Sequence, residues 1–343
     1  MTSYERLMNV LNGKKDDIDR IPCMNSASVS TTEFMKTYDA YWPAAHKDPE
    51  KMAKLGSAAH RLCGLDNVSL PFCMTVEAEV LGAKIKFHED KIKWPSVREF
   101  HVEDPSDLKF PEDVSQAGRV PVVVEAIRRL KKEFEGKAPV NVYMVPPFTS
   151  ISSYLVNSVT FLKWLRKAPE KVHHFLKETL DVYAEIGGSY RDAGADIITL
   201  HGMGASNDNI SPTHFDEFVK PYLKEIIRRL KPPTILNICG SSLMIVDKMV
   251  ECGASAIAVD ERTPIKKARE SVDRVLQGYP IIGNVPSFEV IHKGPVERID
   301  NAVKGCIEDG VSIVAPGCDF WLETPTDHIK AFVKASIQHG TPQ

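Results

Sequence analysis

One histidine and two cysteines stand where short apolar runs end in the second half of the chain. His201 directly follows one such run, Cys239 closes another, and Cys318 comes two residues after a third. Two thiolates and one nitrogen ligand suit zinc, and three protein ligands leave one position open for a substrate. A zinc-bound thiol is deprotonated near neutral pH, so such a site could activate a sulfur nucleophile.

The spacing within one run predicts a shared orientation for two polar residues. Asn237 and Cys239 are two residues apart, and side chains alternate along a strand, so both point to the same side. If that side is the interior of a barrel, Cys239 can meet Cys318 across its mouth. Spacing alone leaves core packing open as the alternative for this pair. We expect core packing for the other five cysteines, which are Cys23, Cys63, Cys73, Cys252 and Cys306.

Eight short runs rich in apolar and β-branched residues predict parallel strands that are buried on both faces. They alternate with amphipathic helical stretches, which favours an α/β fold of the (β/α)8 TIM-barrel type over an open doubly wound sheet. In such barrels the active site lies at the carboxyl ends of the strands, where His201, Cys239 and Cys318 stand. The predicted strands are Arg20–Ser26, Asn67–Phe72, Val140–Val145, Asp196–Leu200, Thr234–Cys239, Ala256–Asp260, Pro280–Val285 and Ser312–Pro316.

Local signals mark two helix starts and one insertion. In the dipeptides Ser211-Pro212 and Thr324-Pro325, an N-cap residue precedes a proline at the first helical position. Residues 73–139 are too many for one simple connection, so we expect them to form an insertion at the rim. This insertion is predicted to hold a β excursion (Ala83–Phe87) and an extra helix (Val120–Glu135) on the upper rim of the barrel.

Length and composition narrow the classes of protein further. The chain has 343 residues, 43% hydrophobic and 26% charged, and shows no linker, so we expect a single TIM-barrel domain over residues 1–343. The net charge of -3 implies no basic surface for nucleic acid. The apolar runs are too short for a membrane span and the N-terminus lacks a secretory signal, so a cytoplasmic location is expected. The seven cysteines, an odd number, argue against a disulfide framework.

At these residues the sequence resembles the methylcobamide:coenzyme M methyltransferases and their bacterial relatives, a branch of the uroporphyrinogen decarboxylase superfamily. The resemblance extends over nearly the whole chain, and its motifs are specific as a set. The matching stretches are Asp19–Pro22, Trp42–His46, Leu70–Glu79, Gly118–Val123, Ile210–Pro212, Gly283–Val285, Gly294–Val296 and Ala315–Cys318.

The resemblance implies a TIM-barrel methyltransferase that moves a methyl group from a methylated corrinoid to a small acceptor. The corrinoid, in its methylcobalamin form, would be carried by a separate corrinoid protein, because this chain has no room for a corrinoid-binding domain. The acceptor would be a thiol such as coenzyme M, or tetrahydrofolate. Decarboxylation of uroporphyrinogen is disfavoured, because the segment Cys23–Ser28 has none of the arginines that would clamp the carboxylates of that substrate.

One position departs from the pattern of the family. Thiol-methylating members hold zinc with a His-x-Cys pair and a later cysteine, which correspond here to Asn237, Cys239 and Cys318. A carboxamide is a poorer zinc ligand than imidazole. His201 or Asp260, at neighbouring strand ends, could supply the third ligand instead. Alternatively, zinc could be weak or absent with tetrahydrofolate as acceptor, or the chain could be a non-catalytic paralogue that binds a corrinoid protein.

The resemblance, and for Asp260 its position at a strand end, suggest roles for further polar residues. Glu79, Asp260 and Asn237 are candidates for catalysis, as groups that orient a ligand or shuttle a proton. Asn284 and His201 are candidates for binding the cofactor. For Glu79 and Asp260, a purely structural charge is the alternative.

Overall fold

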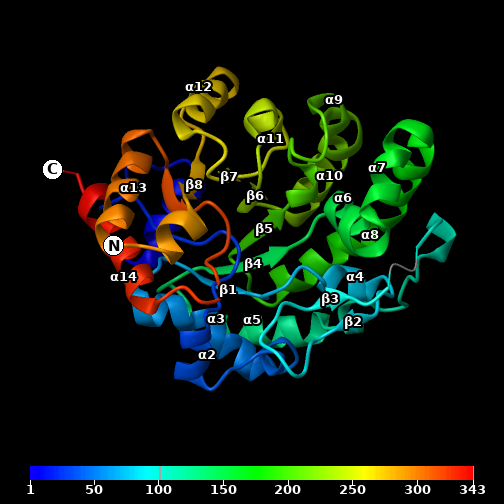
Figure 1. Cartoon of the computed structure of the whole chain (residues 1–343), viewed down its shortest axis with the longest axis horizontal. Coiled ribbons are helices and arrows are strands. Elements are labelled where there is room, and N and C mark those ends of the chain that lie inside the picture. Colours follow the sequence, from blue (N-terminus) through cyan, green and yellow to red (C-terminus); the bar gives the residue numbers. More distant parts are fainter. Residues whose placement is uncertain (100–101, 343) are drawn as a thin grey trace.

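The structure is a computed structural model that describes residues 1–99 and 102–342. A parallel sheet at its centre runs in the order β1-β4-β5-β6-β7-β8-β9, and helices surround it (Figure 1). Neighbouring strands pair in parallel and in chain order, as successive βα units require. These strands are β1 (Val68–Leu70), β4 (Val140–Met144), β5 (Ile197–His201), β6 (Thr234–Ile238), β7 (Ala256–Val259), β8 (Ile281–Val285) and β9 (Ile313–Pro316).

The first predicted strand, Arg20–Ser26, is wrong in extent, although its segment does close the barrel. Cys23 forms an isolated parallel bridge with Val314 of β9. On the other side, the backbone N–H of Asn25 donates to the side-chain oxygen of Asn67, just before β1, at 3.2 Å. Because a side chain replaces the backbone ladder here, no regular strand forms. The other seven predicted strands are confirmed to within two residues at each end.

Helices fill the connections between the strands. Within the described residues, no helix combines the length and the apolar character that crossing a membrane requires. The α-helices are α1 (Ser3–Leu11), α2 (Thr32–Tyr38), α3 (Pro49–Cys63), α4 (Val76–Val80), α5 (Val120–Phe134), α6 (Pro147–Ser150), α7 (Ser158–Lys167), α8 (Pro169–Asp192), α9 (Pro212–His214), α10 (Lys220–Leu230), α11 (Val246–Glu251), α12 (Ile265–Val275), α13 (Val296–Glu308) and α14 (Thr326–Gly340). Short 3-10 or π-helical turns are η1 (Ala44–His46), η2 (Pro105–Asp107), η3 (Val114–Gln116), η4 (Ile151–Leu155), η5 (Met203–Ala205), η6 (Phe215–Val219), η7 (Leu243–Ile245) and η8 (Ser287–His292).

One of the two predicted helix starts is confirmed. The Ser211 hydroxyl accepts the backbone N–H of His214 at 3.2 Å, and the helix begins at the proline after it. The second start is wrong, because α14 begins after Pro325 and the buried Thr324 hydroxyl has no hydrogen-bond partner among the described residues. The carboxylate of Glu33 accepts the backbone N–H of Thr326 at 2.8 Å instead, so a residue from another helix caps α14.

Helix α1 plugs the amino-terminal end of the barrel. Its buried side chains Leu7, Val10 and Leu11 pack in one cluster with residues that point inward from the sheet. These inward residues include Ile197 of β5 and Ile235 of β6. The barrel is therefore filled by apolar side chains at this end, and a site can open only at the carboxyl ends of the strands.

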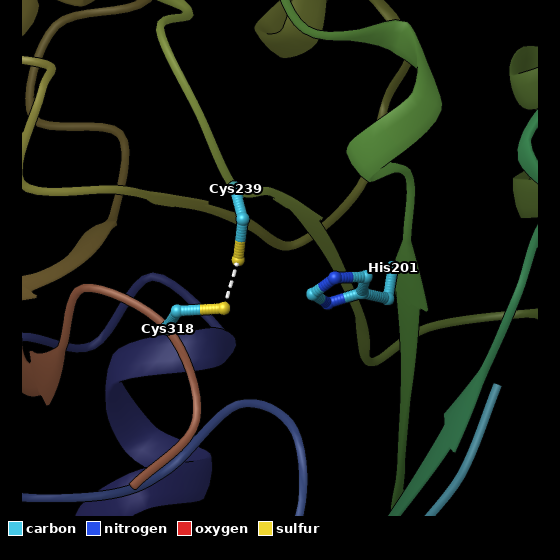
Figure 2. Close-up of side chains that lie close together, drawn as sticks. All are labelled: His201, Cys239 and Cys318. Carbon is cyan, nitrogen blue, oxygen red and sulfur yellow. Dashed lines mark hydrogen bonds between the residues drawn. The ribbon is translucent and has the colours of Figure 1, made fainter. Parts of the chain in front are cut away.

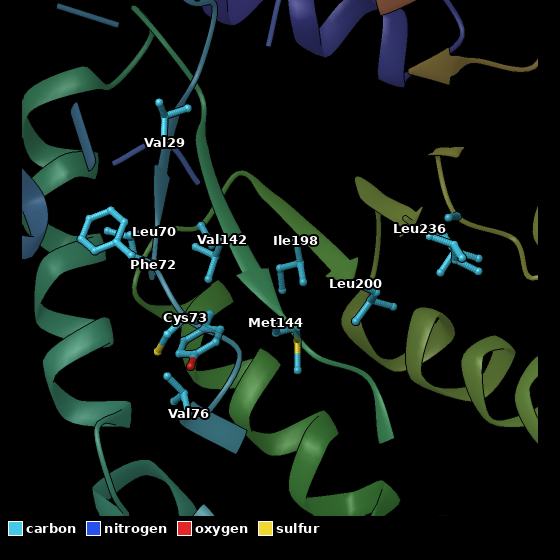
Figure 3. Close-up of a cluster of buried hydrophobic side chains, with 14 of the residues drawn as sticks. Val29, Leu70, Phe72, Cys73, Val76, Val142, Met144, Ile198, Leu200 and Leu236 are labelled. Atoms are coloured by element: carbon cyan, nitrogen blue, oxygen red, sulfur yellow. The ribbon is translucent and has the colours of Figure 1, made fainter. Parts of the chain in front are cut away.

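The outward faces of the strands form a second apolar core with the surrounding helices. Leu70, Val142, Ile198 and Leu200 belong to this cluster, and Figure 3 shows them with their neighbours. Since alternate residues of each strand belong to two different cores, the strands show the continuous apolar character of a sheet that is covered on both faces.

The predicted rim insertion contains its β excursion but not its rim helix. Strands β2 (Ile85–Lys86) and β3 (Ser96–Val97) pair in antiparallel fashion, as the excursion predicts. Helix α5 instead packs against α3 and α8 and against strands β1 and β4. It is thus the crossover helix that joins β1 to β4 in the outer layer, which a parallel connection requires.

Candidate metal centre

The inward-facing residues of β5 and β6 become more polar toward the open end of the barrel. The two strands pair so that His201 stands level with Asn237. Each strand therefore starts with an apolar residue against α1 and ends with a polar group at the mouth. In order toward the mouth, these residues are Ile197, Thr199 and His201 on β5, and Ile235, Asn237 and Cys239 on and just after β6.

His201, Cys239 and Cys318 meet at this mouth, as the strand-end argument predicts for the two cysteines. The sulfurs of Cys239 and Cys318 lie 2.7 Å apart. One ring nitrogen of His201 and both sulfurs all lie within 4.8 Å of one another, and the imidazole points toward the sulfurs (Figure 2). Ligand atoms of a tetrahedral zinc site are about 3–4 Å apart, so the three groups are near enough to share one ion once the two sulfurs move apart.

The His201 ring is buried and available as a ligand. Its exposed fraction is 2%, and its Nδ1 atom has no hydrogen-bond partner among the described residues. Burial lowers the pKa of the imidazole to about 4, so the ring is neutral at physiological pH and keeps a free nitrogen lone pair. The ring of Tyr143 lies edge-on at 5.2 Å and holds its orientation. The unpartnered nitrogen is therefore free to act as a ligand.

The two thiols form a site that favours a cation. Contact with Cys318 and burial raise the pKa of the Cys239 thiol well above its ordinary value, and the carboxyl groups of Asp319 and Asp260 raise it further. A bound divalent cation would reverse this effect, because a coordinated thiol is deprotonated. Two sulfurs and one imidazole nitrogen form a donor set that suits zinc.

Asn237, predicted to act in catalysis, lies beside the sulfurs but its amide is engaged elsewhere. Its Nδ2 atom donates to the hydroxyl of Ser26 at 2.9 Å, and its Oδ1 atom lies 3.8 Å from the sulfur of Cys239. The side chain is 3% exposed. His201 is level with Asn237 on the neighbouring strand.

Asp260 and Asn284 brace the loops around His201, Cys239 and Cys318, which form the candidate metal centre. The carboxylate of Asp260 accepts the backbone N–H groups of Gly240 and Arg262, both at 2.9 Å. The amide of Asn284 donates to the backbone oxygens of Asp260 and Thr263, at 2.9 and 2.7 Å. The polar atoms of both side chains thus hold the ends of β6, β7 and β8 together.

Glu79 belongs to a separate group on the segment after β1. Its carboxylate accepts the Nε–H of Arg119 at 2.6 Å. The same guanidinium donates to the Cys73 sulfur at 3.1 Å and to the Thr75 hydroxyl at 2.8 Å. We call these four residues, Cys73, Thr75, Glu79 and Arg119, the rim network.

Four residues of the mouth were not singled out from the sequence. Ser26 holds Asn237, Tyr143 packs on His201, and Asp319 directly follows Cys318. Burial raises the pKa of the Asp319 carboxyl to about 7. Glu261 follows Asp260 at the end of β7. Ser26 and Tyr143 lie on predicted strands. Glu261 directly follows a predicted strand and Asp319 comes three residues after another, so the strand-end rule includes both, although it assigns them no role.

The remaining cysteines mostly fill the core, as predicted. Cys23, Cys73, Cys252 and Cys306 are buried, and Cys63 is partly exposed on α3. All seven cysteines are free in the structure.

Comparison with known proteins gives one family. A family model described as uroporphyrinogen decarboxylase (URO-D) matches residues 2–339. The chain is 30% identical to the methylated-thiol:coenzyme M methyltransferase of Methanosarcina mazei, over 100% of this chain and 91% of that protein. It is 32% identical to the methylcobamide:CoM methyltransferase MtaA of Methanosarcina barkeri strain Fusaro, over 98% of each.

Two solved structures share the fold. A methyltransferase from Methanosarcina mazei superposes with a TM-score of 0.92 at 32% identity, over 98% of this chain and 99% of that chain. A B12-independent methionine synthase from Shewanella sp. W3-18-1 superposes with a TM-score of 0.63 at 15% identity, over 93% and 97% of the two chains. The second likeness shows the barrel fold alone.

Proposed function

The chain belongs to the uroporphyrinogen decarboxylase family, and we propose that it is a methyltransferase that moves a methyl group from a methylated corrinoid to a thiol. The methyltransferases named above, about 30% identical over the full length of the chain, support methyl transfer from a cobamide. The observation that supports a thiol acceptor is the meeting of His201, Cys239 and Cys318 at the open end of the barrel.

In this proposal His201, Cys239 and Cys318 hold a zinc ion. Zinc, when bound, supplies a Lewis acid that keeps the sulfur of the acceptor in its thiolate form at neutral pH. Cys239 and Cys318 neutralise the dication as thiolates, and the low pKa of His201 leaves its nitrogen free to bind without losing a proton. Asn237 replaces the histidine of the family pattern, and His201 takes over its function from the neighbouring strand.

The transfer itself balances without any redox partner. The carbon–cobalt bond of the methylated corrinoid breaks, and both of its electrons stay on cobalt, which becomes cobalt(I). The sulfur of the acceptor forms the new carbon–sulfur bond with its own electron pair, and its proton has already left to solvent. The barrel aligns the two reactants and excludes water from the sulfur, and alignment of this kind lowers the barrier by about 7–11 kcal/mol at most.

The corrinoid is proposed to arrive on a separate corrinoid protein. The amino-terminal end of the barrel is plugged by α1, so a methylated corrinoid can approach the metal centre only from the open mouth. Such a partner would therefore dock over the carboxyl ends of the strands, with its methyl group directed toward Cys239 and Cys318.

The direct test is methyl transfer by the purified, zinc-loaded protein. Methylcobalamin is mixed with a thiol under anaerobic conditions, and conversion to cob(I)alamin is followed by absorbance while the methyl thioether is identified by mass spectrometry. We expect turnover that stops when zinc is removed with a chelator and resumes when it is restored. Turnover with tetrahydrofolate but with no thiol would contradict the thiol acceptor, and no turnover with either acceptor would favour a non-catalytic binder of corrinoid protein.

A further inference from the structure

Carboxyl groups gather beside the two cysteines at the mouth. Gly317 precedes Cys318, and a side chain at this position would collide with the carboxylate of Glu261. Gly240 follows Cys239, and a side chain there would meet the carboxylate of Asp208 at 2.6 Å. The glycine next to each cysteine therefore leaves room for an acidic side chain beside the candidate metal centre.

Asp319 adds a buried carboxyl oxygen that nothing in the described part of the chain uses. Its Oδ1 atom is shielded from solvent and has no hydrogen-bond partner there. The carboxyl group accepts the backbone N–H of Ser28 and lies near enough to Tyr143 and Cys239 to act on both electrostatically. An oxygen in this position accepts a hydrogen bond whether or not the carboxyl group is ionised, so it is suited to hold a donor.

The positive charge of Arg262, at the same mouth, is already balanced by nearby carboxylates. The Nη1 atom of Arg262 lies 2.8 Å from the carboxylate of Asp208, and its Nε atom lies 4.0 Å from that of Asp260. The carboxyl groups of Asp208, Asp260, Glu261 and Asp319 therefore outnumber the guanidinium of Arg262 at this mouth, and the Oδ1 atom of Asp319 has no partner among the described residues. This excess of carboxyl groups disfavours an anionic ligand and favours a cationic or hydroxyl-bearing one. Like charges brought together at a binding site oppose association, and opposite charges favour it.

We propose that the methyl acceptor is a thiol whose far end is a hydrogen-bond donor, an ammonium or a hydroxyl group, bound by Asp319 and Glu261. This inference rests on the proposed function and specifies its acceptor. Coenzyme M, which appears in the names of the relatives, carries a sulfonate at its far end and is therefore the wrong charge for this mouth.

The test compares three thiols built on the same two-carbon chain. Cysteamine, 2-mercaptoethanol and 2-mercaptoethanesulfonate differ at the far end, which is cationic, neutral or anionic. Their dissociation constants for the zinc-loaded protein are measured by titration calorimetry at pH 7, without any corrinoid. We expect cysteamine to bind at least about tenfold more tightly than the sulfonate, with the alcohol between them.

The three thiols also differ in the basicity of their sulfurs, which can change their affinity for zinc. Variants of the two acidic residues test whether the difference in affinity comes from recognition of the far end of the thiol. In Glu261→Gln and Asp319→Asn, the ratio of the sulfonate to the cysteamine dissociation constant should fall at least about threefold. Glu308→Gln is the matched control, because it removes one carboxylate at the exposed end of α13, before β9 begins at the closed end of the barrel. Its ratio should equal that of the wild type. Zinc content is measured in each variant, and Glu261→Gln decides the question if Asp319→Asn loses zinc.

The outcomes distinguish the charge selectivity of the acceptor site from the proposed methyl transfer. If the sulfonate binds as tightly as cysteamine, or if neither acidic variant changes the ratio, the inference is overturned. If the charge order holds but no thiol is methylated in the methylcobalamin assay, the charge selectivity stands and the proposed function fails. If none of the thiols binds, both are overturned.

Discussion

The metal centre and the rim network contain similar chemical groups in opposite states. In the rim network, the guanidinium of Arg119 donates to Glu79, Cys73 and Thr75. In the metal centre, the sulfurs of Cys239 and Cys318 face each other, and the Nδ1 atom of the buried His201 has no partner among the described residues. Both regions hold a cysteine and lie near the carboxyl ends of strands.

Whether the polar groups of a cluster have hydrogen-bond partners distinguishes a structural cluster from a functional one better than the residue types do. Buried polar groups are normally satisfied, so several ligand-type atoms that meet without partners need an explanation, and a bound ion is one. The polar groups of the rim network satisfy one another, so Glu79 is explained as the partner of a buried guanidinium. Under the proposal, a bound cation would satisfy those of the candidate metal centre. The predictions below test this contrast, from the largest expected effect to the smallest.

The largest expected effect is the loss of one sulfur from the metal centre. Cys318→Ala should lower zinc affinity and methyl transfer by more than about 100-fold, since even groups that only support a metal ligand contribute 10–100-fold. Cys73→Ala is the matched control, because it removes a sulfur from the rim network. It should keep one zinc per chain by elemental analysis. Loss of zinc from both variants, or from neither, would remove the contrast between the two regions.

The second prediction concerns the pH dependence of zinc binding. Both sulfurs bind zinc as thiolates, so two protons should leave, whereas His201, with its pKa lowered to about 4, is already neutral and should release none. Zinc affinity should therefore rise about 100-fold per pH unit between pH 6 and 7. Calorimetry in buffers of different ionisation enthalpy counts the protons. Release of three protons would show that the imidazole is charged before zinc binds.

The third prediction tests the imidazole by moving it to the neighbouring strand. His201→Ala should lower zinc affinity by at least about 10-fold, because one of three ligands is lost and even groups that only support a ligand contribute 10–100-fold. Adding Asn237→His in that background should restore part of the affinity, because the two positions are level in the sheet. In the wild-type background Asn237→His should change affinity little. If Asn237→His raised zinc affinity equally with and without His201, His201 would not fill the third position.

The smallest expected effect is on stability at the rim network. Glu79→Gln leaves the buried guanidinium of Arg119, which is 5% exposed, without its carboxylate. Loss of one partner from a buried ion pair costs about 3–5 kcal/mol. The partly exposed Glu79 and the remaining bonds to Cys73 and Thr75 place the cost at about 2 kcal/mol. Denaturant unfolding measures it, and zinc content should not change. Reduced methyl transfer at normal stability would instead make Glu79 a functional residue.

The parts of the fold that depend on local pattern could be predicted from the sequence. Seven strands follow from short apolar runs, and the inward row of Asn237 and Cys239 follows from the period of two along a strand. The segment Arg20–Ser26 could not be read in this way, because the side chain of Asn67 takes the place of a backbone partner there. Helix α5 was misplaced because its packing between α3 and α8 depends on distant parts of the chain.

The candidate site also has parts that the sequence predicts and parts that it does not. The meeting of Cys239 and Cys318 follows from the rule that strand ends converge at the mouth of a barrel. The choice of His201 over Asp260 as the third donor depends on side-chain partners, since the Asp260 carboxylate is held by backbone N–H groups. The ion pair that explains Glu79 joins two residues 40 positions apart and leaves no local signal.

The most direct test of the metal centre is X-ray absorption at the zinc edge of the purified protein. We predict two sulfur ligands at about 2.3 Å and a histidine nitrogen at about 2.0–2.1 Å in the wild type. In His201→Ala the imidazole signal should disappear while both sulfurs remain. A zinc ion with an unchanged imidazole signal in His201→Ala, or a wild-type protein that binds no zinc, would contradict the proposed site.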